Sequence, residues 1–112
     1  MKTEIIAKNN KGEIVKFINS WCWNENLIEI ISIPNNVTDF VCSSNYIKLL
    51  PELPKILYYL DCHNNQLTSL PNLSENLINL SCEENNIKKL PNLRECNNLV
   101  NVWCDMCCFE DY

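Results

Sequence analysis

Residues 57–76 read LYYLDCHNNQLTSLPNLSEN, and residues 77–98 read LINLSCEENNIKKLPNLRECNN. Both segments carry leucine at positions one and four, cysteine at six, asparagine at nine and Leu or Ile at eleven. The spacing continues on either side, because Cys22, Cys42, Cys62 and Cys82 are twenty residues apart and Cys104 follows after twenty-two. Side chains that recur at a fixed structural period stack on one another, so this spacing predicts a solenoid.

Aligned on these cysteines, the chain divides into repeated units. They span residues 17–36, 37–56, 57–76 and 77–98, followed by the incomplete unit 99–112. In each unit a variable residue separates positions four and six, which is the period-two pattern of a strand with one buried face. The first unit is looser, because Ser20 stands at position four and Glu25 at position nine. Stacking in register predicts a parallel sheet with strands ~4.8 Å apart.

The other half of each unit is predicted to be extended. Pro51, Pro71 and Pro91 lack a backbone N–H and break helices, so this outer side should be irregular or polyproline-like. The pattern as a whole resembles the leucine-rich repeat, whose core is L-x-x-L-x-L-x-x-N/C-x-L, with cysteine in the third leucine position. The LPNL segments at 70–73 and 90–93 are similar to the short bacterial subclass, and IPNNVT at 33–38 is similar to repeats of protists and giant viruses.

This resemblance covers residues 17–112. It implies a horseshoe segment with one short strand per repeat on the concave face, an extended convex side and little helix. The asparagines at position nine, Asn45, Asn65 and Asn85, fall where the strand turns away from the sheet. A buried carboxamide donates and accepts hydrogen bonds, so it can bridge the backbones of neighbouring units. Cys107 takes this position in the last unit. We therefore predict a structural ladder of Cys22, Cys42, Cys62, Cys82 and Cys104 beside Asn45, Asn65 and Asn85.

Residues 1–16 do not fit the repeat. Two apolar segments, Ile5–Ala7 and Glu13–Val15, flank Asn9–Gly12, which contains the only glycine of the chain. This pattern predicts a β-hairpin that caps the first unit. The segment lacks the apolar core of a secretory signal, and no apolar run approaches the ~18 residues of a transmembrane helix. We expect a cytoplasmic protein.

Eight cysteines raise the alternatives of a disulfide scaffold or a zinc site. Neighbouring ladder cysteines would point their Cβ atoms in the same direction, which opposes bridging, so we expect reduced packing residues. The C-x-x-C of Cys104 and Cys107 is explained by the repeat, whereas Cys96 and Cys108 are left unassigned. We expect no metal site and no cofactor.

An enzyme is equally poorly supported. His63 and Glu83 share position seven of adjacent units and could form a histidine–carboxylate pair. No nucleophile lies beside them, because Cys62 points inward, and a solvated surface pair explains them better. A single glycine also excludes a glycine-rich phosphate loop.

The outward positions three, five and seven make up the predicted concave face. From them we select as candidate partner-binding residues Trp21, Trp23, Asp39, Tyr59, Asp61, His63, Glu83, Trp103 and Asp105. Trp and Tyr are typical anchors of protein interfaces, and the carboxylates favour a basic protein or peptide. The alternative is that Trp21 and Trp23 pack under the hairpin and Trp103 under the C-terminal tail.

A net charge of −5 disfavours nucleic acid and anionic membranes as partners. These features predict a non-catalytic protein-interaction module that acts as a monomer, with weak self-association through the 99–105 edge as a further hypothesis. The resemblance leaves an alternative open, namely a recognition fragment related to leucine-rich-repeat effector ubiquitin ligases without their catalytic domain. A small repeat protein with no selected partner is the third interpretation.

Overall fold

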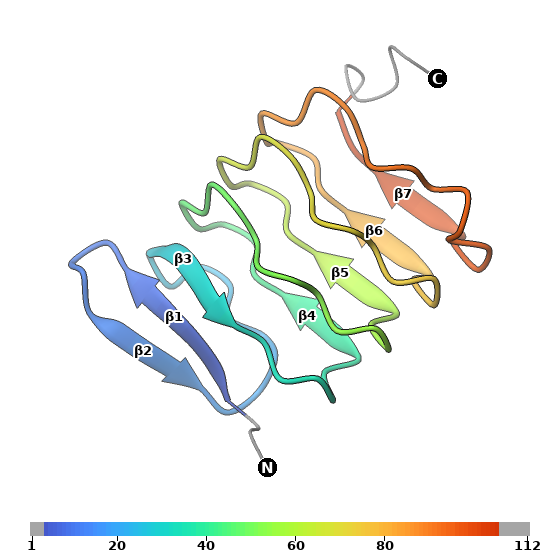
Figure 1. Cartoon of the computed structure of the whole chain (residues 1–112). Coiled ribbons are helices and arrows are strands. Elements are labelled where there is room, and N and C mark those ends of the chain that lie inside the picture. The colour runs from blue at the N-terminus through green and yellow to red at the C-terminus, as the bar shows by residue number, and fades with distance from the viewer. Residues whose placement is uncertain (1–3, 106–112) are drawn as a thin grey trace.

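The computed structural model describes residues 4–105, which form seven strands in two sheets (Figure 1). A three-stranded sheet has the order β2-β1-β3, and a four-stranded sheet has the order β4-β5-β6-β7. The strands are β1 (Ile5–Asn9), β2 (Ile14–Phe17), β3 (Leu27–Ser32), β4 (Asp39–Val41), β5 (Tyr59–Asp61), β6 (Asn79–Ser81) and β7 (Asn101–Trp103). The described residues contain no helix, and hence none that could cross a membrane.

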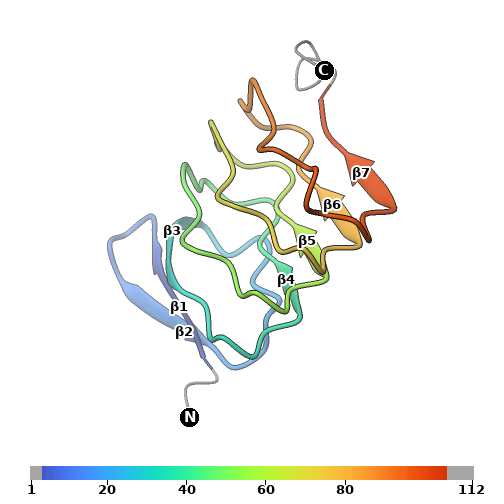
Figure 2. The same ribbon diagram turned by 45° about the vertical axis from the view of Figure 1, so that its right-hand side comes forward.

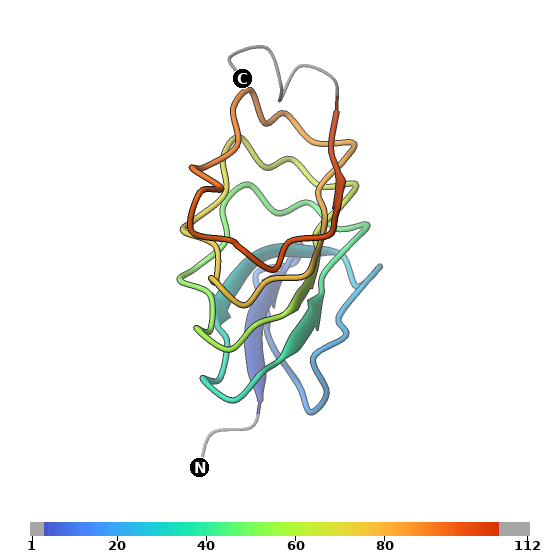
Figure 3. The same ribbon diagram turned by 90° about the vertical axis from the view of Figure 1, so that its right-hand side faces the viewer.

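The four-stranded sheet is parallel and in strict register, with one strand from each of the second to fifth repeats. Asp39 lies opposite Tyr59, Tyr59 opposite Asn79, and Asn79 opposite Asn101. Successive turns of the chain stack on one another behind these strands (Figures 2 and 3). The predicted solenoid is therefore confirmed over the described residues, with each of the first four repeats contributing one coil.

The first repeat differs from the others. It joins the parallel sheet through a single bridge, Trp21 to Val41, rather than through a strand. The Val41 amide donates to the Ser20 carbonyl at 3.0 Å, and the Cys22 amide donates to the Val41 carbonyl at 2.7 Å. Ser20 provides no apolar side chain at position four, so this unit lacks the inward anchor that Phe40, Leu60 and Leu80 give the next three.

The N-terminal hairpin is extended by a strand that the sequence pattern does not predict. The turn uses Gly12 at φ +80°, a left-handed conformation that glycine adopts without a steric penalty. β1 then pairs antiparallel with β3, the outer side of the first repeat. This segment reads LIEIIS and is rich in β-branched residues, with no proline before Pro34. It can therefore form a strand where later repeats carry proline.

The core lies between the parallel sheet and the outer turns. Ile5 and Ala7 from β1 are buried against it, so the hairpin covers its N-terminal end. Fully buried side chains recur at fixed positions of the repeats, and Cys22, Cys42, Cys62 and Cys82 are among them. Cys104 is partly buried and packs against the same cluster.

Asparagine side chains connect adjacent coils. Asn65 Oδ1 accepts the Ile47 amide of the preceding coil at 3.0 Å. Its Nδ2 donates to the carbonyls of Cys42 at 3.0 Å and Cys62 at 3.2 Å, one in each coil. Asn45 and Asn85 make the corresponding bonds, to Cys22 and Cys42 and to Cys62 and Cys82 respectively. Each carboxamide thus ties two coils together at the end of the strand.

The structure also assigns Cys96, which the repeat pattern leaves unexplained. The carbonyls of Pro34, Pro54, Ser74 and Cys96 each accept the amide three residues later, at the first position of the next unit. All four residues are buried, and Cys96 is therefore the turn residue of the fourth repeat. The two extra residues of that repeat lie in the turn before it. Cys108 is outside the described residues.

Candidate partner-binding face

The concave surface consists of three rows of outward side chains. Phe40, Leu60 and Leu80 point inward from the strand centres and are fully buried. The residues on either side of each centre point the opposite way and are partly exposed. The first row contains Asp39, Tyr59, Asn79 and Asn101, and the second contains Trp21, Val41, Asp61, Ser81 and Trp103. The third row follows two residues later and contains Trp23, Ser43, His63, Glu83 and Asp105, of which Ser43 is buried.

All three tryptophans of the chain lie on this face. Trp21, Trp23 and Trp103 are 57%, 55% and 50% exposed. Trp21 and Trp23 are therefore not buried under the hairpin, and packing against the hairpin does not explain these two tryptophans. The segment that could cover Trp103, residues 106–112, is outside the described part of the chain. Trp21 Nε1 donates to Asp39 Oδ2 at 2.8 Å, which fixes the indole beside the next strand.

Three carboxylates cross the face diagonally. Asp39, Asp61 and Glu83 belong to successive repeats and occupy positions three, five and seven. Each accepts a nearby side-chain donor: Asp39 accepts Trp21 Nε1, Asp61 accepts His63 Nδ1, and Glu83 accepts Ser81 Oγ. We call these three residues the acidic diagonal.

His63 is bonded within its own repeat. Its Nδ1 lies against Asp61 Oδ1, and its backbone amide donates to the same oxygen at 3.2 Å. The sequence suggested Glu83 as the partner of His63, but Glu83 accepts from Ser81 instead. Tyr59 lies beside the diagonal, and partial burial, followed by the charges of Asp61 and Asp39, raises the pKa of its phenol.

Asp105 has a different environment from the other candidate contact residues. Its Oδ1 accepts the Glu84 amide at 3.1 Å, and its Oδ2 accepts the Asn85 amide at 3.3 Å. In the preceding repeats the amide that corresponds to Glu84 donates instead to the backbone carbonyl at position seven of the next repeat. The Asn64 amide, for example, donates to the Glu83 carbonyl at 2.9 Å. The Asp105 carboxylate therefore caps the backbone of the fourth repeat. Position in the sequence alone does not reveal this role.

The thiols near this face are unsuited to nucleophilic chemistry. Burial, with a smaller contribution from the charge of Glu25, raises the pKa of Cys22 to about 12. Burial also raises the pKa of Cys42 and Cys62 well above that of an ordinary thiol. Cys62 is adjacent to His63 in sequence, but its side chain is completely buried. A reactive cysteine needs an exposed, stabilised thiolate, and these residues have neither property.

Residues 4–105 also contain no group of three or more His, Cys, Asp or Glu side chains placed to hold a metal ion. The C-x-x-C motif continues into Cys107, which lies outside this range. Open hollows occur on the opposite, outer side of the solenoid. One is lined by residues that include Ile31, Pro51, Leu53 and Ile56, and none of the tryptophans contributes to it.

No protein-family model and no curated protein sequence matches the chain. Among solved structures, nine chains match, including YopM from Yersinia enterocolitica WA-314, a leucine-rich-repeat protein. The alignment has 33% sequence identity and a TM-score of 0.66, and it covers 70% of this chain. It spans only 17% of the YopM chain, so the likeness concerns the repeat architecture.

Proposed function

We propose that this leucine-rich-repeat solenoid is a non-catalytic protein-interaction module that binds a protein or peptide through its concave sheet. One observation carries the proposal: Trp21, Trp23 and Trp103 are about half exposed on one side of the solenoid. The solvated face of a sheet is normally polar, and folding gains little from half-exposed indoles.

The exposed aromatic surface is large enough to contribute substantially to binding. A fully buried aromatic side chain covers about 150–250 Å². Three half-exposed indoles therefore present roughly 300 Å², which would contribute about 7 kcal/mol on complete burial at 25 cal/mol per Å². Association itself costs about 4–15 kcal/mol, so tryptophan contacts alone would give weak binding. The remaining affinity would come from the polar side chains between them.

We also propose that the protein works in a reducing compartment such as the cytoplasm. Cys22, Cys42, Cys62 and Cys96 are buried free thiols. Oxidising compartments favour disulfides in small domains, whereas these thiols serve as packing residues.

A ligase-related role is testable separately. If the chain were catalytic, ubiquitin should be discharged from a charged conjugating enzyme in its presence. We expect no discharge, because Cys22, Cys42 and Cys62 are buried and burial raises the pKa of each thiol.

The interaction itself is tested by affinity capture with matched variants, followed by titration of the captured partner in purified form. Trp23→Ala and Tyr59→Ala change the concave face. Leu49→Ser and Ile56→Ser change exposed residues of the outer side and serve as controls. We expect the first pair to weaken binding at least tenfold, which corresponds to about 1.4 kcal/mol, with thermal unfolding nearly unchanged. Equal losses from both pairs would refute the assignment of the face.

A further inference from the structure

We propose that the concave face recognises an extended segment carrying a cationic residue at every second position, laid obliquely across the strands. This inference rests on the proposed function and specifies the chemistry of the partner. It follows from the spacing of the acidic diagonal, its hydrogen bonds and the tryptophans at its two ends.

The spacing follows from the observed register. Val41 and Asp61 are opposite each other, as are Asp61 and Ser81. Asp39 precedes Val41 by two residues, and Glu83 follows Ser81 by two. Each step of the diagonal therefore combines one strand separation of ~4.8 Å with two residues along the strand, ~6.7 Å, which gives about 8 Å. Three carboxylates thus span about 16 Å.

The spacing of alternate side chains in an extended chain comes close to this interval. Side chains at alternate positions point to the same side and are ~6.7 Å apart. Cations at three alternate positions would cover about 13 Å of backbone. Arginine and lysine side chains are long and flexible enough to take up the remaining few ångströms. Three adjacent cations would instead alternate between the two sides of an extended chain and could not all face the diagonal.

The carboxylates are held in place yet retain acceptor capacity. A carboxylate has about four acceptor sites. The contacts from Trp21 and Thr38 use two sites of Asp39, and the two bonds from His63 use two of Asp61. Ser81 Oγ uses one site of Glu83. Such anchored acceptors lose little conformational entropy when they bind a cation, which favours affinity.

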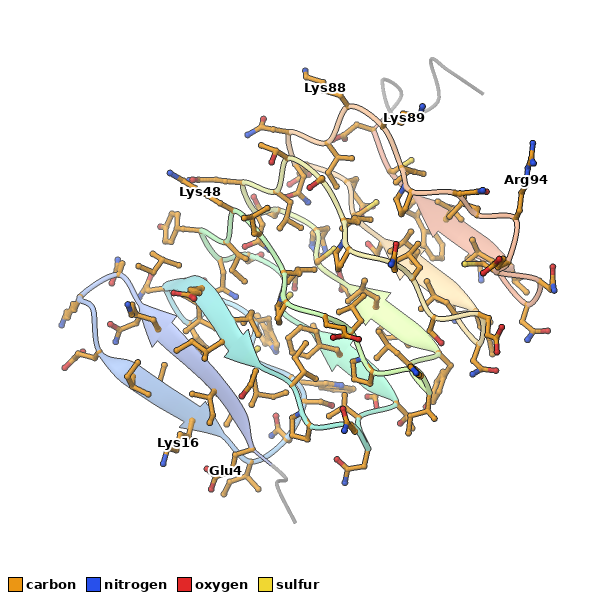
Figure 4. The ribbon with its side chains drawn as sticks, in the orientation of Figure 1. Glu4, Lys16, Lys48, Lys88, Lys89 and Arg94 are labelled. Atoms are coloured by element: carbon orange, nitrogen blue, oxygen red, sulfur yellow. The ribbon has the colours of Figure 1, made fainter. Side chains whose placement is uncertain are left out.

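The charge distribution supports the same partner. None of the outward positions three, five and seven in the five repeats carries Lys or Arg. Cationic residues lie elsewhere, and Figure 4 shows Lys48, Lys88 and Lys89 along one rim of the solenoid, away from the strands. At these positions His63 is the one basic side chain, and it contacts Asp61; no Lys or Arg offsets the carboxylates of the face, so a basic segment would be attracted to it.

The tryptophans favour arginine over lysine. Trp21 is hydrogen-bonded to Asp39 at one end of the diagonal. Trp103 lies opposite Ser81, the residue that donates to Glu83 at the other end. A planar guanidinium can stack on an indole while it pairs with a neighbouring carboxylate, which an ammonium group does less well.

Two capped peptides of identical composition test the proposal. One is acetyl-Ser-Arg-Ser-Arg-Ser-Arg-Ser-amide, and the other is acetyl-Ser-Ser-Arg-Arg-Arg-Ser-Ser-amide. Binding is measured by calorimetry and by tryptophan fluorescence, which reports on this face directly because all three tryptophans lie there. We expect the alternating peptide to bind about tenfold more tightly, equivalent to ~1.4 kcal/mol, and its lysine counterpart to bind more weakly.

Variants locate the binding site on the protein. Asp39→Asn, Asp61→Asn and Glu83→Gln remove charge with little change in shape and should each weaken the alternating peptide several-fold. Glu52→Gln, on the outer side, is the charge-matched control and should have no effect. Unfolding midpoints are measured for every variant, and any variant that unfolds is replaced by the corresponding alanine.

Equal affinity for the two peptides, absence of binding at millimolar concentration, or insensitivity to the diagonal variants would overturn the proposal. Its failure differs from failure of the proposed function. If Trp23→Ala still abolishes binding of a captured partner while the peptides do not discriminate, the interaction module stands and only the cationic specificity falls. If neither readout depends on the face, both fall.

Discussion

Replacing Asn65 with alanine should be among the most damaging single changes in the chain. Asn65 is buried and makes hydrogen bonds to two coils. Alanine would leave the Ile47 amide without this acceptor and would remove a donor from the Cys42 and Cys62 carbonyls. A buried polar group left unsatisfied costs about 1–3 kcal/mol, so the loss should total about 2–4 kcal/mol.

Urea denaturation provides the measurement. A small domain has an unfolding free energy of about 5–15 kcal/mol and an m-value of about 1–3 kcal/mol per molar urea, so the midpoint should fall by roughly 1–2 M. Asn72→Ala changes an exposed asparagine of the outer side and should stay within about 0.5 kcal/mol of the original protein.

Asn65→Asp provides a second comparison that keeps the size of the side chain. Its carboxylate would face the carbonyl oxygens of Cys42, Cys62 and His63, so it should destabilise at least as strongly as alanine at neutral pH. A loss below about 1 kcal/mol for Asn65→Ala, or a loss equal to that of Asn72→Ala, would refute the role of the carboxamide in joining the coils.

Three further predictions concern the backbone, the thiols and the C-terminal end. Glu84 has φ +58°, so Glu84→Gly should stabilise the protein by about 0.5–1 kcal/mol in urea, whereas Glu75→Gly, in a turn without positive φ, should not. Burial raises the pKa of Cys22 to about 12, so this thiol should resist labelling at pH 8 unless the protein is unfolded. The pKa of Cys22 in the folded protein lies above the unfolded value of 9.0, so the contribution of this thiol to folding stability is complete below pH 9. That contribution declines as pH rises towards 12, by up to ~1.4 kcal/mol per pH unit. Urea midpoints that do not change with pH above 9 would contradict this. Asp105→Ala should accelerate hydrogen exchange at the Glu84 and Asn85 amides and cost about 1–3 kcal/mol, while unchanged exchange would argue against the cap.

The repeated part of the fold is predictable because each coil imposes the same requirements on its sequence. Cys62 and Asn65 recur as Cys82 and Asn85, since each strand needs a small inward residue and a carboxamide joins the coils at the ends of the three strands β4, β5 and β6. The period thus reveals both the stacking of the coils and the direction of the side chains. It gives the composition of the concave face for the same reason.

Features that occur once are less predictable. β3 pairs with β1 because a β-branched segment happens to lie beside the hairpin, and no other repeat provides a comparison. Asp105 occupies the same repeat position as Glu83, but its carboxylate accepts two backbone amides. This role depends on the environment at the end of the described stack. The pairing of His63 with Asp61 rather than Glu83 depends on side-chain rotation, which the period does not determine.

The unit 57–76 meets the unit before it and the unit after it through the same set of bonds. The Cys42 amide donates to Asp61, and the Cys62 amide donates to Ser81, at 2.9 and 2.8 Å. A tandem copy of this twenty-residue segment inserted after Asn76 would therefore find compatible partners above and below. Each duplication would lengthen the molecule by ~4.8 Å and add another aspartate and another histidine to the concave face. A duplication of sixty nucleotides in the gene would in this way lengthen the solenoid without changing the packing of its core.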